Sequence, residues 1–96
     1  MLIQQKQEGS KGSFYVEENE ITLAEMTYSM TGTGLMIIDH TEVSDELRGK
    51  NAGYQLVKAA VENARTNHIK IIPLCPFAKS VFDKKHDEFG DVLRGN

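Results

Sequence analysis

Residues 35–65, LMIIDHTEVSDELRGKNAGYQLVKAAVENAR, contain the pattern that decides the fold. The stretch opens with a continuous apolar run, Leu35-Met36-Ile37-Ile38, which is typical of a strand covered on both faces. Its second half places apolar residues on one face of a helix and polar residues opposite, the apolar ones being Leu56, Val57, Ala60, Val61 and Ala64. The stretch therefore predicts a buried strand, a loop and an amphipathic helix. We expect the helix to end near Asn67-His68, because asparagine readily takes the left-handed conformation that closes many helices.

The residues before this stretch predict an antiparallel β-meander. Ser13-Phe14-Tyr15-Val16 is typical of a strand, residues 17–20 of a polar turn, and residues 24–30 alternate apolar and polar side chains. A second turn is expected at residues 31–34. A short first strand is expected around Leu2 to Gln7, with residues 8–12 as its connection. Tight turns of this kind join antiparallel neighbours.

The residues after the helix predict one more strand and a last helix. The segment from Ile69 to Pro76 is apolar but contains two prolines, which cannot donate to a sheet ladder, so we expect this strand to be splayed on one side. Apolar spacing from Phe77 indicates a helix through about His86, followed by an irregular or short helical tail at residues 87–93. The order predicts an α+β fold: an antiparallel meander, a helix, a splayed strand and a C-terminal helix, with the helices packed on the sheet.

Composition restricts the class of protein. With 96 residues, 40% of them hydrophobic and 26% charged, we expect one folded domain over residues 1–96. No apolar run reaches the roughly 18 residues of a membrane span, and the first residues have no signal-peptide core, so we expect a soluble cytoplasmic protein without a membrane partner. Cys75 is the one cysteine, which excludes an internal disulfide and a multi-cysteine metal site. We predict no metal.

The charges divide unevenly between the two halves of the chain. Residues 1–48 hold three basic and nine acidic side chains, whereas residues 49–96 hold eight basic and five acidic. An acidic chain, with a net charge of −3 and no dense basic stripe, is a poor candidate for nucleic-acid binding. A small anionic ligand on the second half remains open, as does ordinary solvated surface charge.

A short loop before the main helix is the strongest local signal for a ligand. Arg48-Gly49-Lys50-Asn51-Ala52-Gly53-Tyr54 exposes backbone N–H groups at the positive end of the helix, where phosphate groups bind. Arg48 and Lys50 would add charge-assisted contacts to the same anion. The loop matches neither a Walker loop nor a GxGxxG fingerprint, and an ordinary strand-to-helix connection fits the pattern as well.

These segments resemble the GNAT superfamily of N-acyltransferases. Its acetyl-CoA motif, Q/R-x-x-G-x-G/A, is matched at its ends by Arg48 and Gly53, while Asn51 stands where the first glycine is expected. Asparagine tolerates positive φ, which would absorb this departure. An H-T-E-V segment at residues 40–43 and a P-x-C-P-F segment at residues 73–77 resemble a small GNAT-like subgroup, and the likeness covers roughly residues 13–93.

The resemblance implies acetyl-CoA as cosubstrate and assigns a set of contacts. The backbone of residues 41–43 would bind the pantetheine arm in the splayed part of the sheet, and the amides of residues 49–54 would bind the pyrophosphate. Lys79 and Ser80 would reach the nucleotide end. The cofactor-binding candidates are Thr41, Glu42, Val43, Arg48, Gly49, Lys50, Asn51, Ala52, Gly53, Tyr54, Pro76, Phe77, Lys79 and Ser80.

Two chemical routes fit an acyltransferase of this sequence. An amine can attack acetyl-CoA directly, or Cys75 can take the acetyl group first and pass it on. A histidine beside a cysteine supplies the thiolate, and we expect His40 to face Cys75 across the splay, with Glu42 on the same face as His40 and able to orient it. The alternatives are a core cysteine and a histidine that hydrogen-bonds a strand end.

The sequence alone identifies neither the acceptor nor the oligomeric state. No motif selects among amine acceptors, whether small molecules or proteins, although the acidic first half would attract a cationic amine. We expect a monomer or a weak homodimer. A non-catalytic module that binds CoA or acyl-CoA, and a protein-interaction domain, are the alternative functions.

Overall fold

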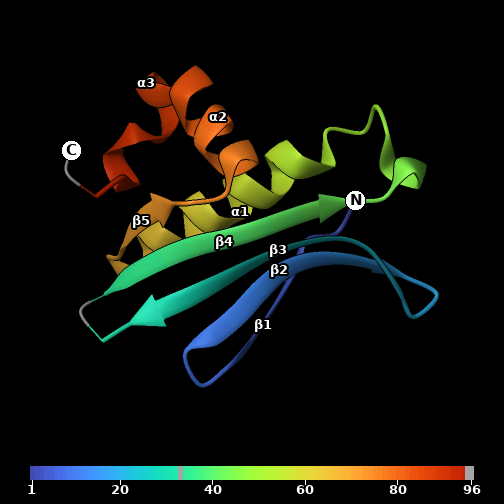
Figure 1. Ribbon diagram of the computed structural model, residues 1–96, viewed down its shortest axis with the longest axis horizontal. Helices are drawn as coiled ribbons and strands as arrows, with labels where there is room; N and C mark the ends of the chain where they lie inside the picture. Colours follow the sequence, from blue (N-terminus) through green and yellow to red (C-terminus); the bar gives the residue numbers. More distant parts are fainter. Residues whose placement is uncertain (33, 95–96) are drawn as a thin grey trace.

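The computed structural model describes residues 1–32 and 34–94 (Figure 1). The elements in chain order are β1 (Gln4–Glu8), β2 (Lys11–Glu18), β3 (Ile21–Thr31), β4 (Leu35–Val43), the 3-10 turn η1 (Asp45–Leu47), α1 (Ala52–Asn67), β5 (Lys70–Pro73), α2 (Pro76–Lys84), α3 (His86–Phe89) and the 3-10 turn η2 (Gly90–Val92).

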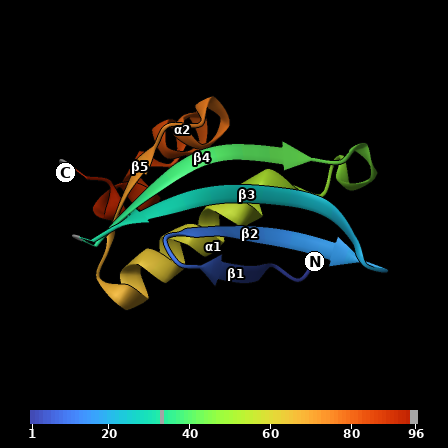
Figure 2. The same ribbon diagram turned by 60° about the horizontal axis from the view of Figure 1, so that its bottom comes forward.

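The strands form one sheet in the order β1-β2-β3-β4-β5. The first four strands are antiparallel neighbours, as the meander predicts, and β5 pairs with β4 in parallel after the α1 crossover. The helices lie on one side of this sheet, and the other side is uncovered (Figure 2). We call this uncovered side the open face. The predicted α+β class is confirmed.

The predicted element boundaries need three corrections. The first strand is Gln4–Glu8 and lies slightly later than expected. Helix α1 ends where predicted, but the left-handed residue is His68 (φ 55°, ψ 45°) and not Asn67, which is still helical. The last predicted helix, α2, ends at Lys84, two residues before the expected His86, and α3 and η2 form the short helical tail expected after it. Thr33, in the predicted second turn, lies outside the described residues.

One apolar core joins the sheet to the helices. The predicted helical face is buried as a unit, because Leu56, Val57, Ala60, Val61 and Ala64 are at most 1% exposed. Tyr28 is also buried, and its hydroxyl group donates to Gln7 and accepts from Gln5. Packing of α1 and α2 on the same face of the sheet fixes the N-termini of both helices beside the end of β4 (Figure 1).

A β-bulge in β4 decides which side chains of that strand face the helices. Tyr28 pairs with Ile38 but Thr27 pairs with His40, so Asp39 is an extra residue on β4. The buried Met26 pairs with Thr41, so Thr41 faces the helices, whereas Thr27 and His40 face the open side. Each residue after the bulge therefore lies on the face opposite to the one that strict alternation gives it.

Candidate functional site

The sheet opens between β4 and β5 beyond Ile38. Pairing of the two strands stops at Ile38 and Pro73, and the amides of Leu74 and Cys75 both donate to the Ile38 carbonyl, at 3.0 and 3.2 Å. In the described part of the chain no strand pairs with this side of β4 over residues 39–43. The splay predicted from the two prolines is confirmed, and it leaves backbone groups of β4 able to bind a peptide-like chain.

Cys75 lies at this opening and at the N-terminus of α2. It is the N-cap residue of the helix, Pro76 follows at the first helical position, and the side chain is only 5% exposed. Its sulfur lies 3.4 Å from Thr41 Oγ1. The strand end and the helix start together fix the thiol between the sheet and α2.

The surroundings of Cys75 favour the thiolate. Burial raises the pKa of the thiol, and this is the largest single effect, but it is outweighed by the Thr41 hydroxyl and by backbone amides of Ala78, Phe77 and Thr41, so the pKa is lowered. The amides of Phe77 and Ala78 belong to the first turn of α2, whose dipole also stabilises negative charge. Cys75 therefore belongs to the buried core and also lies in surroundings that favour a reactive thiol.

His40 does not lie beside Cys75. The β-bulge places His40 on the open face, beside Thr27. On that face the Nε2 atom of His40 lies 3.1 Å from Glu42 Oε1. Cys75 instead contacts Thr41, which faces the helices. The expectation that His40 faces Cys75 is wrong, while the expectation that Glu42 lies on the same face as His40 is confirmed. The thiol and the imidazole stand on opposite sides of the splayed strand.

The loop before α1 borders a large groove. Asn51 is the N-cap of α1 in the left-handed conformation (φ 61°, ψ 31°), as its place in the motif requires, and Gly49 has φ 80°. The groove has a volume of about 970 Å³ and lies between this loop, the end of β4 and α2. It is lined by Val43, Leu47, Arg48, Gly49, Asn51, Ala52, Gly53, Tyr54, Phe77, Ser80, Val81, Lys84 and Lys85.

Gly53 has a packing reason to be glycine. A Cβ atom at this position would clash with Cζ of Phe77, so the ring rests directly on the α1 backbone. Phe77 is 41% exposed and forms part of the groove wall. The first turns of α1 and α2 are therefore in contact at the predicted phosphate loop, and both helix N-termini meet the groove.

The basic residues of the groove differ in part from those expected. Arg48 lines it and also donates to Asp45 at 3.0 Å. Lys50 and Lys79 do not line it, and neither do Thr41, Glu42 and Pro76, which lie nearer the splay or on other surfaces. Lys84 and Lys85 do line it and were missed, with Lys85 Nζ 5.7 Å from the centre of the Tyr54 ring. Their helical spacing from Ser80 and Val81 could have revealed them.

Two further observations concern metal ligands and membrane-spanning helices. Among residues 1–32 and 34–94, no three His, Cys, Asp or Glu side chains are grouped as metal ligands. Within the same residues, the helices are too short or too polar to cross a membrane.

Comparison with solved structures places this fold in the class of GCN5-like acetyltransferases. A GCN5-like protein of Staphylococcus aureus, assigned as an N-acetyltransferase and solved by NMR, is 44% identical, with a TM-score of 0.72 over 97% of this chain and 89% of that one. The model of the GCN5-related N-acetyl-transferase family matches residues 13–92. The chain belongs to the GCN5-related N-acetyltransferase family.

More distant structures share the fold. A ribosomal-protein-alanine N-acetyltransferase from Brucella melitensis has a TM-score of 0.64 at 14% identity, over 80% of this chain and 62% of that one. An IAA acetyltransferase from Bacillus cereus has a TM-score of 0.59 at 18% identity, over 78% of this chain and 53% of that one. The chain thus spans less than two thirds of the length of these enzymes. A search of curated proteins gave no match.

Proposed function

We propose that this N-acetyltransferase binds acetyl-CoA in the groove and transfers the acetyl group to an amine by way of Cys75. The observation that carries the proposal is the position of the Cys75 thiol, at the N-terminus of α2 and 3.4 Å from Thr41 Oγ1, with a lowered pKa. A thiolate held at the opening of the sheet is placed to accept an acyl group from a thioester.

The groove supports a specific orientation of the cosubstrate. The amides at the start of α1, next to Asn51, would hold the pyrophosphate. Arg48, Lys84 and Lys85 supply positive charge for the nucleotide phosphates. The pantetheine arm would then run past Val43 toward Cys75. The backbone amide of Thr41 contacts the Cys75 sulfur. Backbone amides two residues apart in a strand point to the same side, so the amide of Val43 also points into the opening.

The transfer takes place in two steps. The Cys75 thiolate attacks the carbonyl carbon, a bond from Cys75 Sγ to that carbon forms, the bond to the CoA sulfur breaks, and CoA leaves as a thiolate. An amine then attacks the acetyl-cysteine, Cys75 leaves as a thiolate, and the amine gives up a proton. His40 lies on the open face with Glu42 and would take that proton, so in this proposal its role concerns the acceptor and not Cys75.

Intact-mass spectrometry after mixing with acetyl-CoA tests the acyl-enzyme. We expect the wild-type chain to gain the mass of one acetyl group and Cys75→Ala to gain none. An equal gain in Cys75→Ala would refute the route through the cysteine. A chain that is stabilised by acetyl-CoA but neither gains the label nor acetylates any amine would be a binding module instead.

Thermal unfolding with acetyl-CoA tests the groove. At 100 times the dissociation constant, the free energy of unfolding rises by about 2.7 kcal/mol. That gain corresponds to an increase in Tm of roughly 10–20 °C for a domain of this size. We expect Lys84→Ala to weaken binding several-fold, and more at low salt than at high salt. Lys58→Ala, an exposed lysine on α1 outside the groove, is the matched control and should bind like the wild type. Equal affinities of the two variants would remove Lys84 from the site.

A further inference from the structure

The route of the acceptor follows from the two sides of the splay. The groove for acetyl-CoA lies on the helix-covered side of the sheet, between the loop before α1 and α2. The cosubstrate would fill that side up to Cys75, so an amine must approach the acetyl group from the open face. Nothing in the described chain covers this face (Figure 2).

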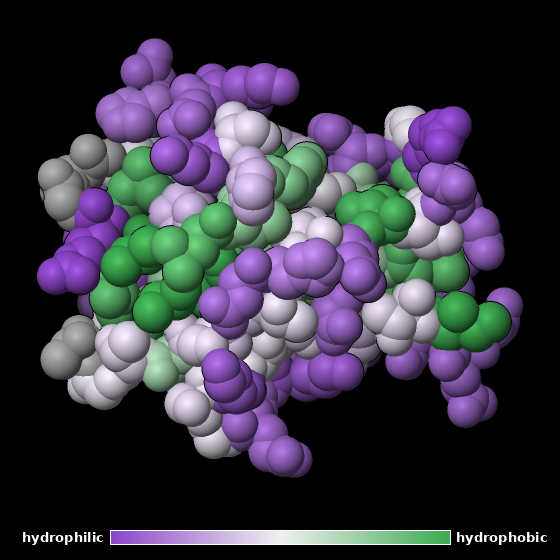
Figure 3. Space-filling view, in the orientation of Figure 1, coloured by the Kyte–Doolittle hydropathy of each residue, from purple (hydrophilic) through white to green (hydrophobic). Residues whose placement is uncertain are grey.

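An apolar patch lies on the open face beside the splay. Its members are Leu35, Ile37, Ile72 and Leu74, which we call the β4–β5 patch. Ile37 pairs with Ile72 across the two strands, and both are partly exposed. Leu74 is 64% exposed and lies next to these two residues at the edge of the opening, where its amide donates to the Ile38 carbonyl. In Figure 3 apolar side chains gather over β5 and the first half of β4.

Acidic groups border the patch on the side of the splay. Asp39 follows the patch along β4 and accepts a hydrogen bond from Ser29 at 2.9 Å. Glu42 lies beyond it, next to His40. Lys70, on β5, pairs with Leu35 at the end of the patch away from the splay, and its Nζ donates to the Asp91 carbonyl at 2.6 Å. Lys11, on β2, has its Nζ 2.8 Å from Ser29 Oγ, the hydroxyl that donates to Asp39.

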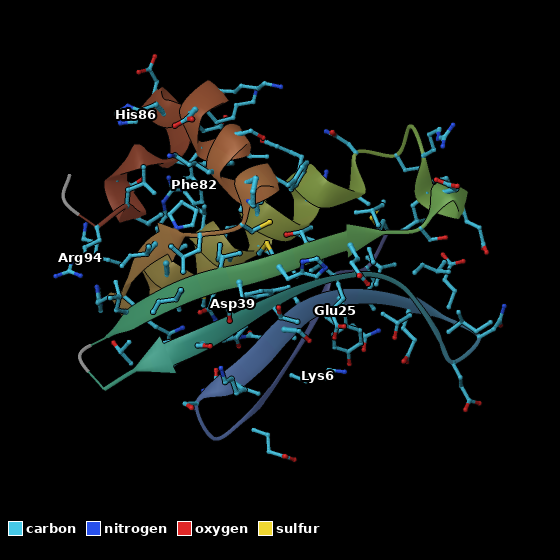
Figure 4. All side chains as sticks on the ribbon, in the orientation of Figure 1. Lys6, Glu25, Asp39, Phe82, His86 and Arg94 are labelled. Carbon is cyan, nitrogen blue, oxygen red and sulfur yellow. The ribbon has the colours of Figure 1, made fainter. Side chains whose placement is uncertain are left out.

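Lys6 is on β1 and is paired with Glu25 at 3.6 Å. Figure 4 labels Lys6, Glu25 and Asp39, which lie along three strands of the sheet. The carboxylates nearest the opening are therefore Asp39 and Glu42, and they favour a cation there.

We infer that the acceptor is a cationic amine with an apolar body, which docks its body on the β4–β5 patch and its ammonium group between Asp39 and Glu42. This inference rests on the proposed function and names the substrate class. The carboxylates attract the ammonium group, and the exposed His40 imidazole takes one of its protons and releases it to water. The free amine then attacks the acetyl group through the splay, and His40 takes the second proton, which the amine loses on attack. The apolar body removes the patch from water, which gives larger apolar amines the advantage.

A series of straight-chain alkylamines tests the substrate class. Ethylamine, butylamine and hexylamine have nearly the same head group, so differences in kcat/KM report contact with the apolar chain. Complete burial of one methylene group raises an equilibrium constant for binding about fourfold. A half-exposed patch contributes about half of that free energy, which is about twofold in the constant. We therefore expect about a twofold gain per methylene, or roughly 15-fold between ethylamine and hexylamine.

Two exposed positions give a matched pair of variants. Leu74→Ser should lower kcat/KM for hexylamine about fourfold and leave ethylamine unchanged. Ile21→Ser is the control, because Ile21 is 62% exposed at the start of β3, outside the patch, and should leave the series as in the wild type. Acetylation of Cys75 by acetyl-CoA should be the same in both variants.

The outcomes separate this inference from the proposed function. If Cys75 is acetylated but kcat/KM does not rise along the series, or Leu74→Ser keeps the wild-type rise, the substrate class is wrong and the proposed function stands. Sedimentation that shows a stable dimer dissociated by Leu74→Ser would also overturn the inference, since a second copy would then cover the patch. If neither acetyl-cysteine nor turnover with any amine is found, both proposals fail.

Discussion

Replacing Thr41 with valine removes one hydroxyl group that stabilises the Cys75 thiolate and changes the side-chain volume very little. The hydroxyl lies 3.4 Å from the sulfur. Hydrogen bonds to charged groups contribute about 1.5–3 kcal/mol, and this long contact belongs at the lower end. A change of about 1.4 kcal/mol is tenfold in a protonation equilibrium, so we expect the equilibrium of the thiol to shift roughly tenfold toward the protonated form. At a pH where the thiol is mostly protonated, the remaining thiolate is more nucleophilic by about threefold, so alkylation is about threefold slower there.

The thiolate absorbance of the single cysteine, followed against pH, measures this change directly. In the wild type the midpoint should lie below the ordinary cysteine value, because the pKa of Cys75 is lowered, and in Thr41→Val it should move to higher pH. Alkylation at neutral pH provides the second readout. Thr27→Val is the matched control, since Thr27 lies on the open face. Identical titrations of Thr41→Val and the wild type would refute the assignment of Thr41 to the stabilisation of the thiolate.

Three further substitutions test the groove and the C-terminal packing. Gly53→Ala should cost about 1–2 kcal/mol in unfolding free energy and weaken acetyl-CoA binding in titration, because its Cβ would meet the exposed Phe77 ring, which must swing outward. Asn51→Val should cost about 1–2 kcal/mol by thermal unfolding, since φ is 61°, whereas a glycine at this position should be tolerated. Arg65→Ala should lower Tm by about 4 °C, because the half-exposed contacts with Asp91, at 2.7 and 3.0 Å, contribute at most about 1 kcal/mol. The Arg65 hydrogen bond lowers the pKa of Asp91, so this difference in Tm should be largest at neutral pH and shrink as the pH falls through the acidic range where Asp91 is protonated. The part that remains comes from the hydrogen bond of Arg65 to the Glu88 carbonyl, at 2.6 Å.

The parts of the fold that sequence predicts are those with local signals. Alternation at residues 24–30 and the helical face from Leu56 define their elements without knowledge of distant contacts, and both are confirmed. The left-handed Asn51 was predictable because the motif calls for glycine there and asparagine tolerates the same conformation. The two prolines indicated the splay for a similar reason, since the missing N–H group is a property of the residue itself.

The parts that sequence misses depend on pairings between distant residues. Lys84 and Lys85 line the groove because α2 packs against the start of α1, and this packing is not visible in the local sequence. The expected pair of His40 and Cys75 is absent because the pairing with β3 places His40 on the open face and Thr41 toward the helices. No local signal marks Asp39 as an extra residue, because the bulge is a property of the register between β3 and β4. Its effect is to bring Thr41 to the cysteine.

The bulge itself can be tested by changing the number of residues in β4. Deleting Asp39 removes the extra residue, so His40 follows Ile38 directly and regular alternation keeps His40 and Glu42 on the open face and Thr41 toward the helices. Cys75 then keeps the Thr41 hydroxyl, so its titration midpoint should stay at the wild-type value and should not rise as it does in Thr41→Val. Asp39→Ala keeps the residue count and should leave the midpoint unchanged, and circular dichroism shows whether the deletion variant is folded.

A folded deletion variant whose midpoint rises as in Thr41→Val, or a shifted midpoint in Asp39→Ala, would contradict this account of the register. The distinction matters for function because the side chains of Thr41 and His40 are adjacent in sequence and serve opposite sides of the splay in the proposed reaction. The pairing of Met26 with Thr41 and of Thr27 with His40 lets a single strand face the thiol with a hydroxyl group and the acceptor with an imidazole. The constraint at position 39 therefore lies in the side chain, whose carboxylate would meet the acceptor in the proposed reaction, and not in the number of residues.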